Sequence, residues 1–391
     1  MGTNNIIFFA RSSLSNSLEA GEEVGLELQS QLAGQSAGAV LLFASSRHNY
    51  PELLQSIART CPAPCLVGCS SAGEFVTGDA GEGGICAVAL AGDGMSFSVG
   101  LGQDLSHDPE AAARSIVEGF QGLREGETRF RAALVFADAL TGSAEDLVEQ
   151  LTIATQGQYQ LVGGGAGDDG NFRHTEVFRG SESFTDAAVA LEILSDKPLG
   201  IGTSHGWVPA GEGMRVTRAE GKKVISLNAS PAREAFEEHA LATGQKVDWD
   251  NPLSFFLHNV LGIAGPQGYK LRVPLAFEED GAVLCASEIP EGSVIHFMKT
   301  SINAGADAAQ KAAQRALEEL NGEEPLAAIF FDCVATRLRM GQDFSLELER
   351  LQDTLLGAEF AGYNTYGQIA RAEGQFCGFH NCTAVVCVLP R

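Results

Sequence analysis

The amino-acid sequence predicts an α/β protein built from mixed parallel and antiparallel sheets with helices on the sheet faces. The main observation is a recurring pattern, in which an apolar, strand-like run breaks abruptly into glycine and polar residues. This happens in three stretches, at residues 66–75, 161–168 and 360–369. Each stretch follows an amphipathic helical pattern and precedes another apolar run. Strands that alternate with helices favour parallel pairing, and hairpin-like junctions between the units add antiparallel pairs.

The first unit has the order βαβαββ. Apolar residues recur at Leu18, Val24, Leu28 and Leu32 among Glu and Gln, which is the period of a helix. Pro51 opens a second helix, because proline is tolerated in a first helical turn. The expected elements are strand 5–10, helix 18–32, strand 40–44, a helix from 51, the strand and turn at 66–75, and strand 85–90.

The same order returns twice downstream, and the two copies are separated by a stretch that fits it poorly. In this stretch we expect a hairpin of 214–216 with 224–227, and a helix from Ser230, its N-cap, to Ala242. The sequence therefore predicts three clear and one degenerate βαβαββ-like repeat units. The second unit is expected over 95–194 and the last over 293–389.

The repeat also predicts how the strands are arranged. Four strands should occupy equivalent places, each paired as a hairpin with a preceding apolar strand: 5–10, 95–101, 199–204 and 293–299. The first of them has no predecessor in the chain. We expect it to pair with the last strand, 383–389, which would otherwise leave an unpaired edge.

Composition and charge exclude several classes of protein. The 391 residues contain 26 Lys and Arg against 50 Asp and Glu, a formal charge of −24. This argues against binding to nucleic acids or to anionic membranes, since both depend on basic residues. No apolar run approaches the roughly 18 residues of a membrane helix, and the N-terminus lacks a signal-peptide pattern, so we expect a cytoplasmic protein. Nine cysteines, several in apolar runs, predict reduced and buried thiols.

A set of short motifs, in this order, resembles the FIST proteins: 67–75, 162–168, 205–209, 216–221, 290–292, 362–369 and 379–383. The resemblance implies a FIST N-terminal domain at 1–212 with two repeat units, and a FIST C-terminal domain at 213–391 with the degenerate and the last unit. It implies a bacterial sensory protein that binds a small ligand and signals through a partner such as a histidine kinase. One branch of the family binds haem and senses nitric oxide. A homodimer is a further expectation.

Ligand-binding residues are expected at the three glycine loops. Ligands of such sheets bind beyond the carboxyl ends of strands, and glycine leaves backbone N–H groups accessible. The spacing fits neither a dinucleotide nor a phosphate-binding fingerprint. The last unit combines amides and aromatic residues without charge, although Gln368 stands where the family usually has Glu. The candidates are Cys69, Ser70, Ser71, Glu74, Asp168, Asn364, Tyr366, Gln368, His380 and Asn381. Internal hydrogen bonding of a buried loop would account for the same residues.

Two further interpretations remain open. His205 and His380 lie beside aromatic residues, as a haem-iron ligand would, and without a C-x-x-C-H motif any haem would be non-covalent. Cys69 or Ser70 could instead be the nucleophile of a hydrolase or transferase. Residues 68–73 are one residue too long for the G-x-S-x-G turn and precede a strand, so binding is favoured over catalysis.

Overall fold

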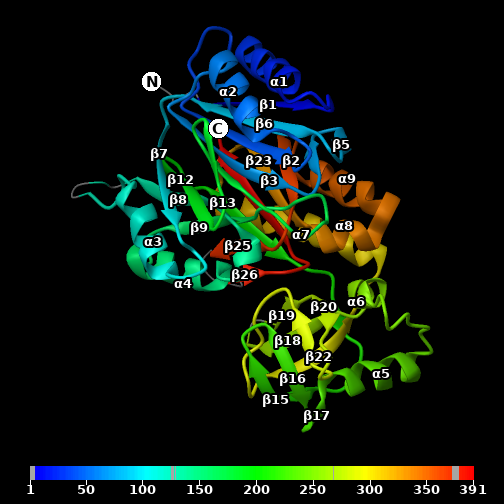
Figure 1. Cartoon of the computed structure of the whole chain (residues 1–391). Helices are drawn as coiled ribbons and strands as arrows, with labels where there is room; N and C mark the ends of the chain where they lie inside the picture. Colours follow the sequence, from blue (N-terminus) through cyan, green and yellow to red (C-terminus); the bar gives the residue numbers. More distant parts are fainter. Residues whose placement is uncertain (1–4, 125–126, 128, 267, 372–377) are drawn as a thin grey trace.

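The computed structural model describes residues 5–124, 127, 129–266, 268–371 and 378–391. Within these residues, three six-stranded sheets surround a common centre with their helices outside, and a fourth, nine-stranded sheet is set apart at one end (Figure 1). We call residues 6–204 and 301–390 the body and residues 205–300 the insertion. The predicted class, mixed sheets with helices on their faces, is confirmed.

The first sheet is built mainly from the first repeat unit. The second and third strands of the unit run parallel to each other, and the last strand lies between the first and the second and pairs antiparallel with both. Side chains of Asn16 and Asn49 cap the two helices. The elements are β1 (Ile6–Ser12), α1 (Ser17–Leu32), β2 (Ala39–Ser45), α2 (Tyr50–Thr60), β3 (Cys65–Ser71) and β6 (Ile85–Ala91).

The second unit repeats this order and pairing in the second sheet. Its elements are β7 (Met95–Gln103), α3 (Pro109–Glu118), β8 (Phe130–Ala137), η1 (Ala139–Thr141), α4 (Ala144–Ala154), β9 (Gln160–Gly165) and β12 (Ala187–Ser195). The third sheet follows the same plan. Its elements are β13 (Gly200–Ser204), α7 (Ile302–Glu319), β23 (Pro325–Cys333), α8 (Val334–Met340), η2 (Gly341–Phe344), α9 (Ser345–Thr354), β24 (Glu359–Thr365) and β27 (Ala384–Pro390).

Each unit also gives a short hairpin to a neighbouring sheet. The donated hairpins are β4 (Glu74–Val76) with β5 (Asp79–Gly81), β10 (Val177–Arg179) with β11 (Glu182–Phe184), and β25 (Gln368–Arg371) with β26 (Gly378–His380). They pair antiparallel with β24, β3 and β9, respectively. The exchange is cyclic: the first unit extends the third sheet, the second extends the first, and the third extends the second.

Two expectations about strand arrangement are wrong. The first strand of the last unit is β13, and residues 294–299 form β22 in the insertion, which separates β13 from α7. A strand directly before a helix looks like the start of a unit, and the insertion ends with such a strand. The N-terminal strand β1 pairs with β6, in a different sheet from β27. β27 pairs with β23 on one side and with β13 on the other, so neither of its edges is left unpaired.

The insertion is an antiparallel sheet with two helices around a cluster of phenylalanines. Phe236 packs against Phe256 and Phe297, with ring centroids 5.5 and 4.8 Å away. The expected hairpin is confirmed as β15 with β16, but the helix begins at Ala232 and Ser230 does not cap it. The elements are β14 (Val208–Pro209), β15 (Met214–Glu220), β16 (Lys223–Leu227), β17 (Ser230–Pro231), α5 (Ala232–Thr243), α6 (Leu253–His258), β18 (Leu261–Gly265), β19 (Gly268–Arg272), β20 (Pro274–Phe277), β21 (Val283–Cys285) and β22 (Val294–Lys299).

The inner faces of the three sheets share one core, while each outer face packs on its own helices. Phe43, Phe136 and Phe331 come from the corresponding strands β2, β8 and β23. Their rings meet in the centre, with centroids 5.6 Å apart for Phe43 and Phe136 and 6.4 Å apart for Phe136 and Phe331. The eight cysteines in the described part of the chain are free and buried, as expected.

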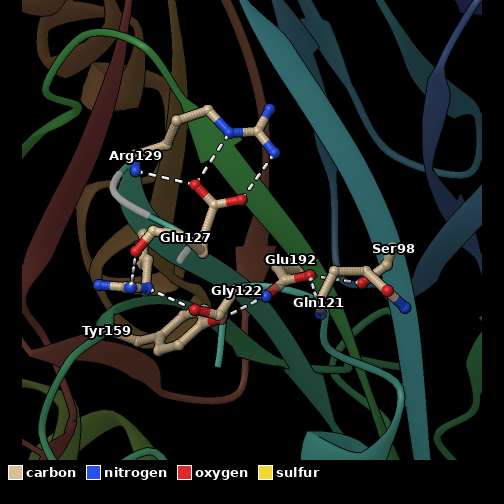
Figure 2. A network of polar contacts seen from close by, with 8 residues as sticks. Ser98, Gln121, Gly122, Glu127, Arg129, Tyr159 and Glu192 are labelled. Atoms are coloured by element: carbon tan, nitrogen blue, oxygen red, sulfur yellow. Dashed lines mark hydrogen bonds and ion pairs between the residues drawn. The ribbon is translucent and has the colours of Figure 1, made fainter. Parts of the chain in front are cut away.

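A buried carboxyl group secures the loop after α3. Figure 2 shows Glu192 of β12 surrounded by donors: the backbone N–H groups of Gln121 (2.6 Å) and Gly122 (2.8 Å) and the Ser98 hydroxyl (2.6 Å). The Tyr159 hydroxyl donates a fourth hydrogen bond. Buried polar groups need such partners. The network therefore holds the loop on the second sheet.

Candidate functional site

The three glycine loops meet at the centre of the body. Gly167 N donates to Ser70 O (2.8 Å), Tyr366 N to Gly165 O (3.1 Å), and Ala72 N to Asn364 O (3.0 Å). The carboxyl ends of β3, β9 and β24 therefore converge through backbone hydrogen bonds. The convergence brings the three loops together, and many of the predicted candidates on them serve to hold the loops.

The candidates of the first loop are fully buried. Ser71 donates to the Glu74 carboxyl group, which also accepts from Gly84 N at 3.2 Å. Burial raises the pKa of Glu74 to about 8. Ser70 accepts from Glu176 N at 2.9 Å, and burial raises the pKa of the Cys69 thiol. Neither Cys69 nor Ser70 lines any of the cavities described below, so the nucleophile interpretation gains no support here.

Asp168 organises the second loop. Its carboxylate accepts from Phe172 N (2.7 Å), Arg173 N (2.7 Å) and His174 N (2.9 Å), and from the Tyr366 hydroxyl. The same hydroxyl accepts from Gly170 N at 2.9 Å. The Tyr366 ring stacks on Phe172 with centroids 4.4 Å apart. Asp168 is therefore a structural acceptor, and it fixes Tyr366 and Phe172 in position.

We expect Tyr366→Phe to lower the free energy of unfolding by about 1–3 kcal/mol, because it leaves buried partners of the hydroxyl unsatisfied. Urea denaturation measures the loss. The matched control is Tyr269→Phe, since no hydrogen bond of the Tyr269 hydroxyl is recorded within the described residues. Equal losses for the two variants would contradict the role of the Tyr366 hydroxyl.

The polar set of the last unit divides among three places. Tyr366 and Asn381 line one cavity, Asn364 lines a second, and His380 lines a third. Gln368 lines none of these three; with its amide turned to suit its neighbours, it accepts from Thr365 Oγ1 (2.6 Å) and from Cys333 N (3.2 Å). The predicted site is thus only partly assembled, around Tyr366 and Asn381.

The first of these cavities lies between the body and the insertion, and we call it the junction cavity. Its volume is about 240 Å³. Phe172 and Tyr366 come from the body loops, and Leu257 and Val273 come from the insertion. Most of its wall is apolar, with Asn381 and Lys222 as the main polar contributors.

The ammonium group of Lys222 places a positive charge at the junction cavity. Its side chain lies against Gly142, where a Cβ atom would stand 2.3 Å from Nζ. Burial lowers the pKa of Lys222, against the attraction of Glu288. Within the described residues, no carboxylate is recorded within 4.0 Å of the Lys222 amine. A half-buried ammonium without an ion pair favours an anionic ligand group.

The second cavity lies beside α8 and has a volume of about 460 Å³. Glu74, Asn364 and Arg337 line it. Arg337 donates to Ala72 O at 2.6 Å and pairs with the exposed Glu82 at 2.5 Å. The charge of this guanidinium is therefore already compensated, unlike that of Lys222.

The two histidines do not fit haem in this arrangement. They line the third cavity, of about 190 Å³, together with Arg315. This is smaller than the roughly 300–1,000 Å³ of pockets for drug-sized ligands, and haem is larger than most of those. Both ring nitrogens of His205 are engaged, Nε2 with Tyr269 O (2.9 Å) and Nδ1 with Trp207 N (3.3 Å). Burial and the charges of Lys270 and Arg272 lower the pKa of His380 to about 3.

Sequence reasoning missed Lys222, Phe172 and Cys333 as cavity residues. Lys222 belongs to a hairpin turn and Cys333 ends an apolar strand, so neither carries a local signal. Phe172 follows the predicted glycine loop by four residues. Only the docking of the insertion on the body brings the three together.

Comparison with known proteins gives matches over most of the chain. Residues 38–230 match the FIST N domain and residues 232–371 match the FIST C domain. An uncharacterized protein of Methanocaldococcus jannaschii is 24% identical over 318 residues, which cover 76% of this chain and 60% of that protein. The match thus spans less than two thirds of the relative.

Two solved structures are distantly similar. Cyanuric acid hydrolase from A. caulinodans shares 9% identity at a TM-score of 0.38, with 99% of this chain and 100% of that chain covered. Phosphoribosylformylglycinamidine synthase II from Thermotoga maritima shares 13% identity at a TM-score of 0.23, with 98% and 72% covered. At these values neither likeness bears on the activity of this chain.

Proposed function

Because the chain belongs to the FIST family, we propose that it is a sensory protein that binds a small carboxylate in the junction cavity. The observation that carries this proposal is Lys222, which has no ion pair among the described residues and lies at an otherwise mainly apolar cavity. An apolar body with one anionic group matches that lining. The proposal concerns the ligand class and leaves the ligand itself open.

The size of the cavity supports a ligand of a few more atoms than benzene. An apolar protein cavity of about 150 Å³ is known to accept benzene, and the junction cavity is about 240 Å³. Phe172, Leu257 and Val273 would contact the apolar part of the ligand. The Asn381 amide donates to His380 O at 3.1 Å, and its oxygen faces Val273 N at 3.5 Å, which fixes its orientation.

The position of the cavity suggests how binding would be transmitted. A ligand there contacts the body through Tyr366 and the insertion through Leu257 at the same time. It would therefore stabilise one relative arrangement of the two parts, because it binds that arrangement more tightly than the other.

Among the described residues, no helix combines the length and apolar character needed to cross a membrane.

The proposal also covers the location of the protein, its signalling partner and its oligomeric state. We place the protein in the cytoplasm, with its output passed to a partner protein such as a histidine kinase, and with a homodimer as the signalling unit. The division into domains at 1–212 and 213–391 belongs to the same proposal. Measuring phosphorylation of a purified kinase with and without the protein tests the output separately from ligand binding.

We expect Lys222→Met to weaken carboxylate binding at least about ten-fold, because hydrogen bonds to charged groups contribute roughly 1.5–3 kcal/mol. Benzoate and 3-methylbutanoate are suitable probes, and their neutral amides should bind more weakly than the acids. Ligand-induced thermal shifts and calorimetry measure the difference.

The matched control is Lys246→Met, because Lys246 is an exposed lysine of the same insertion and does not line the cavity. It should leave binding unchanged. Equal affinity of the parent protein for the acids and the amides, or unchanged binding in Lys222→Met, would rule out the proposed role of Lys222.

A further inference from the structure

Two cysteines lie in contact beneath the junction cavity. Cys333 is the last residue of β23, and Cys382 lies in the turn before β27. Both are buried, 3% and 4% exposed, in an apolar cluster with Trp207, Val273 and Met298 of the insertion. The two thiols share a hydrogen bond, and Cys333 also lines the junction cavity. The pair therefore combines close sulfurs with a space that small molecules can reach.

The surroundings of Cys333 favour its thiolate. A hydrogen bond from the Cys382 side chain, together with the backbone N–H groups of Cys382 and Ala335, lowers the pKa of Cys333 to about 6 in spite of burial. The remaining proton lies on Cys382, whose pKa is raised by the same contact. Burial raises the pKa of Cys285 and Cys387 to about 12, and neither lines the junction cavity. A thiolate is the form of cysteine that reacts as a nucleophile.

We propose that Cys333 and Cys382 form a redox-active pair that reacts with a small hydroperoxide entering the junction cavity and closes a disulfide. This function goes beyond carboxylate binding and does not depend on it, since it needs only the cavity and the two thiols. The pair is then a site of reversible oxidation in the floor of the cavity.

The reaction balances with the peroxide as the only oxidant. The Cys333 thiolate attacks one oxygen of the peroxide, the O–O bond breaks, and the leaving oxygen takes a proton to form water or an alcohol. Cys333 is now a sulfenic acid. The Cys382 sulfur attacks the Cys333 sulfur, the S–O bond breaks, and the departing hydroxide takes the Cys382 proton as water. Two electrons pass from the two sulfurs to the peroxide.

The test uses the full, reduced chain and stoichiometric hydrogen peroxide. Mass spectrometry of the intact protein and of unreduced peptides should show the loss of two hydrogens and a link between Cys333 and Cys382, reversed by a dithiol reductant. In the unoxidised parent, Cys333 should react with iodoacetamide at pH 7 at least about ten-fold faster than Cys285. Its rate should rise with pH through a midpoint near 6.

Variants separate the two steps. Cys333→Ser should abolish the disulfide, and Cys382→Ser should stop the reaction at a sulfenic acid that dimedone traps. Cys387→Ser is the matched control, since Cys387 is equally buried but lies in β27 away from the cavity, and it should still form the link. Preferential oxidation of other cysteines in the parent protein, or no Cys333–Cys382 link, would overturn the proposal whether or not the variants fold.

The same experiment distinguishes this proposal from carboxylate binding. A probe that binds next to Cys333 should slow the oxidation by covering the thiolate. A disulfide that forms while no probe binds would refute only the ligand proposal. Probe binding without a disulfide would refute only the redox pair.

Discussion

Gly362→Ala is expected to lower the free energy of unfolding by about 3–5 kcal/mol or to prevent folding, as overpacking of a rigid core does. A Cβ atom on Gly362 would stand 1.9 Å from Phe330 O and 2.6 Å from Phe75 Cε2. The first contact is with the backbone of the neighbouring strand, which cannot move without breaking the sheet. Urea denaturation of the parent and variant measures the loss.

The control is Gly211→Ala, since no heavy atom lies within 4 Å of the Cβ position there. The equivalent glycines of the other two units make the comparison stronger. A Cβ atom would stand 1.8 Å from Leu42 O at Gly68 and 2.0 Å from Val135 O at Gly163. All three alanine variants should therefore be similarly unstable. A loss below about 1 kcal/mol for any of them would contradict the equivalence of the three strands.

The second large effect is on the pH dependence of stability, and it comes from Glu74. Burial raises the pKa of Glu74 to about 8 in the folded protein, against 4.5 in an unfolded chain. Between these values the unfolded state releases the proton and the folded state keeps it, so stability falls as pH rises. The contribution is complete below pH 4.5 and is lost as the pH rises through 8.

Glu74→Gln should remove this part of the slope, because the amide can donate to Ser71 and accept from Gly84 N without ionising. Relative to the parent, the variant should gain roughly 3–5 kcal/mol of stability between pH 5 and pH 8. Denaturation at several pH values measures it. Glu347 adds a slope of the same sign, since burial also raises its pKa to about 8, so some pH dependence persists.

Glu149→Gln provides the comparison for that experiment. Glu149 is an exposed acid on α4 for which no ion pair is recorded among the described residues, so its replacement should leave the slope unchanged. Parallel pH profiles for the parent and Glu74→Gln would show that the Glu74 carboxyl group ionises normally in the folded state.

The sequence predicted most of the elements of the body because their signals are local. The continuous apolar run of β2 and the helical period from Leu18 to Leu32 depend only on neighbours in the chain. The hairpin exchange had no such signal. The strands β4 and β5 have three residues each, and their partner β24 lies far away in the sequence.

The candidate site was predicted in part for the same reason. The glycine loops identified Tyr366, and the aromatic and amide residues after them identified Asn381, both of which line the junction cavity. Leu257 and Val273 look like ordinary core residues in the sequence, and Lys222 looks like an ordinary turn residue. The sequence therefore did not mark these three residues as part of a site. Asp168 was read as a ligand-binding acid, whereas its partners in the structure are backbone N–H groups of its own loop and the Tyr366 hydroxyl.

The cyclic hairpin exchange has a consequence for synthesis on the ribosome. The hairpin β4–β5 leaves the ribosome about 280 residues before its partner β24, which at roughly 5–20 residues per second is a wait on the order of 14–56 seconds. During this time Phe75, buried in the finished protein, has no third sheet to pack against. The nascent chain thus carries an unpaired strand edge and an uncovered Phe75 side chain long before the third sheet exists to cover them.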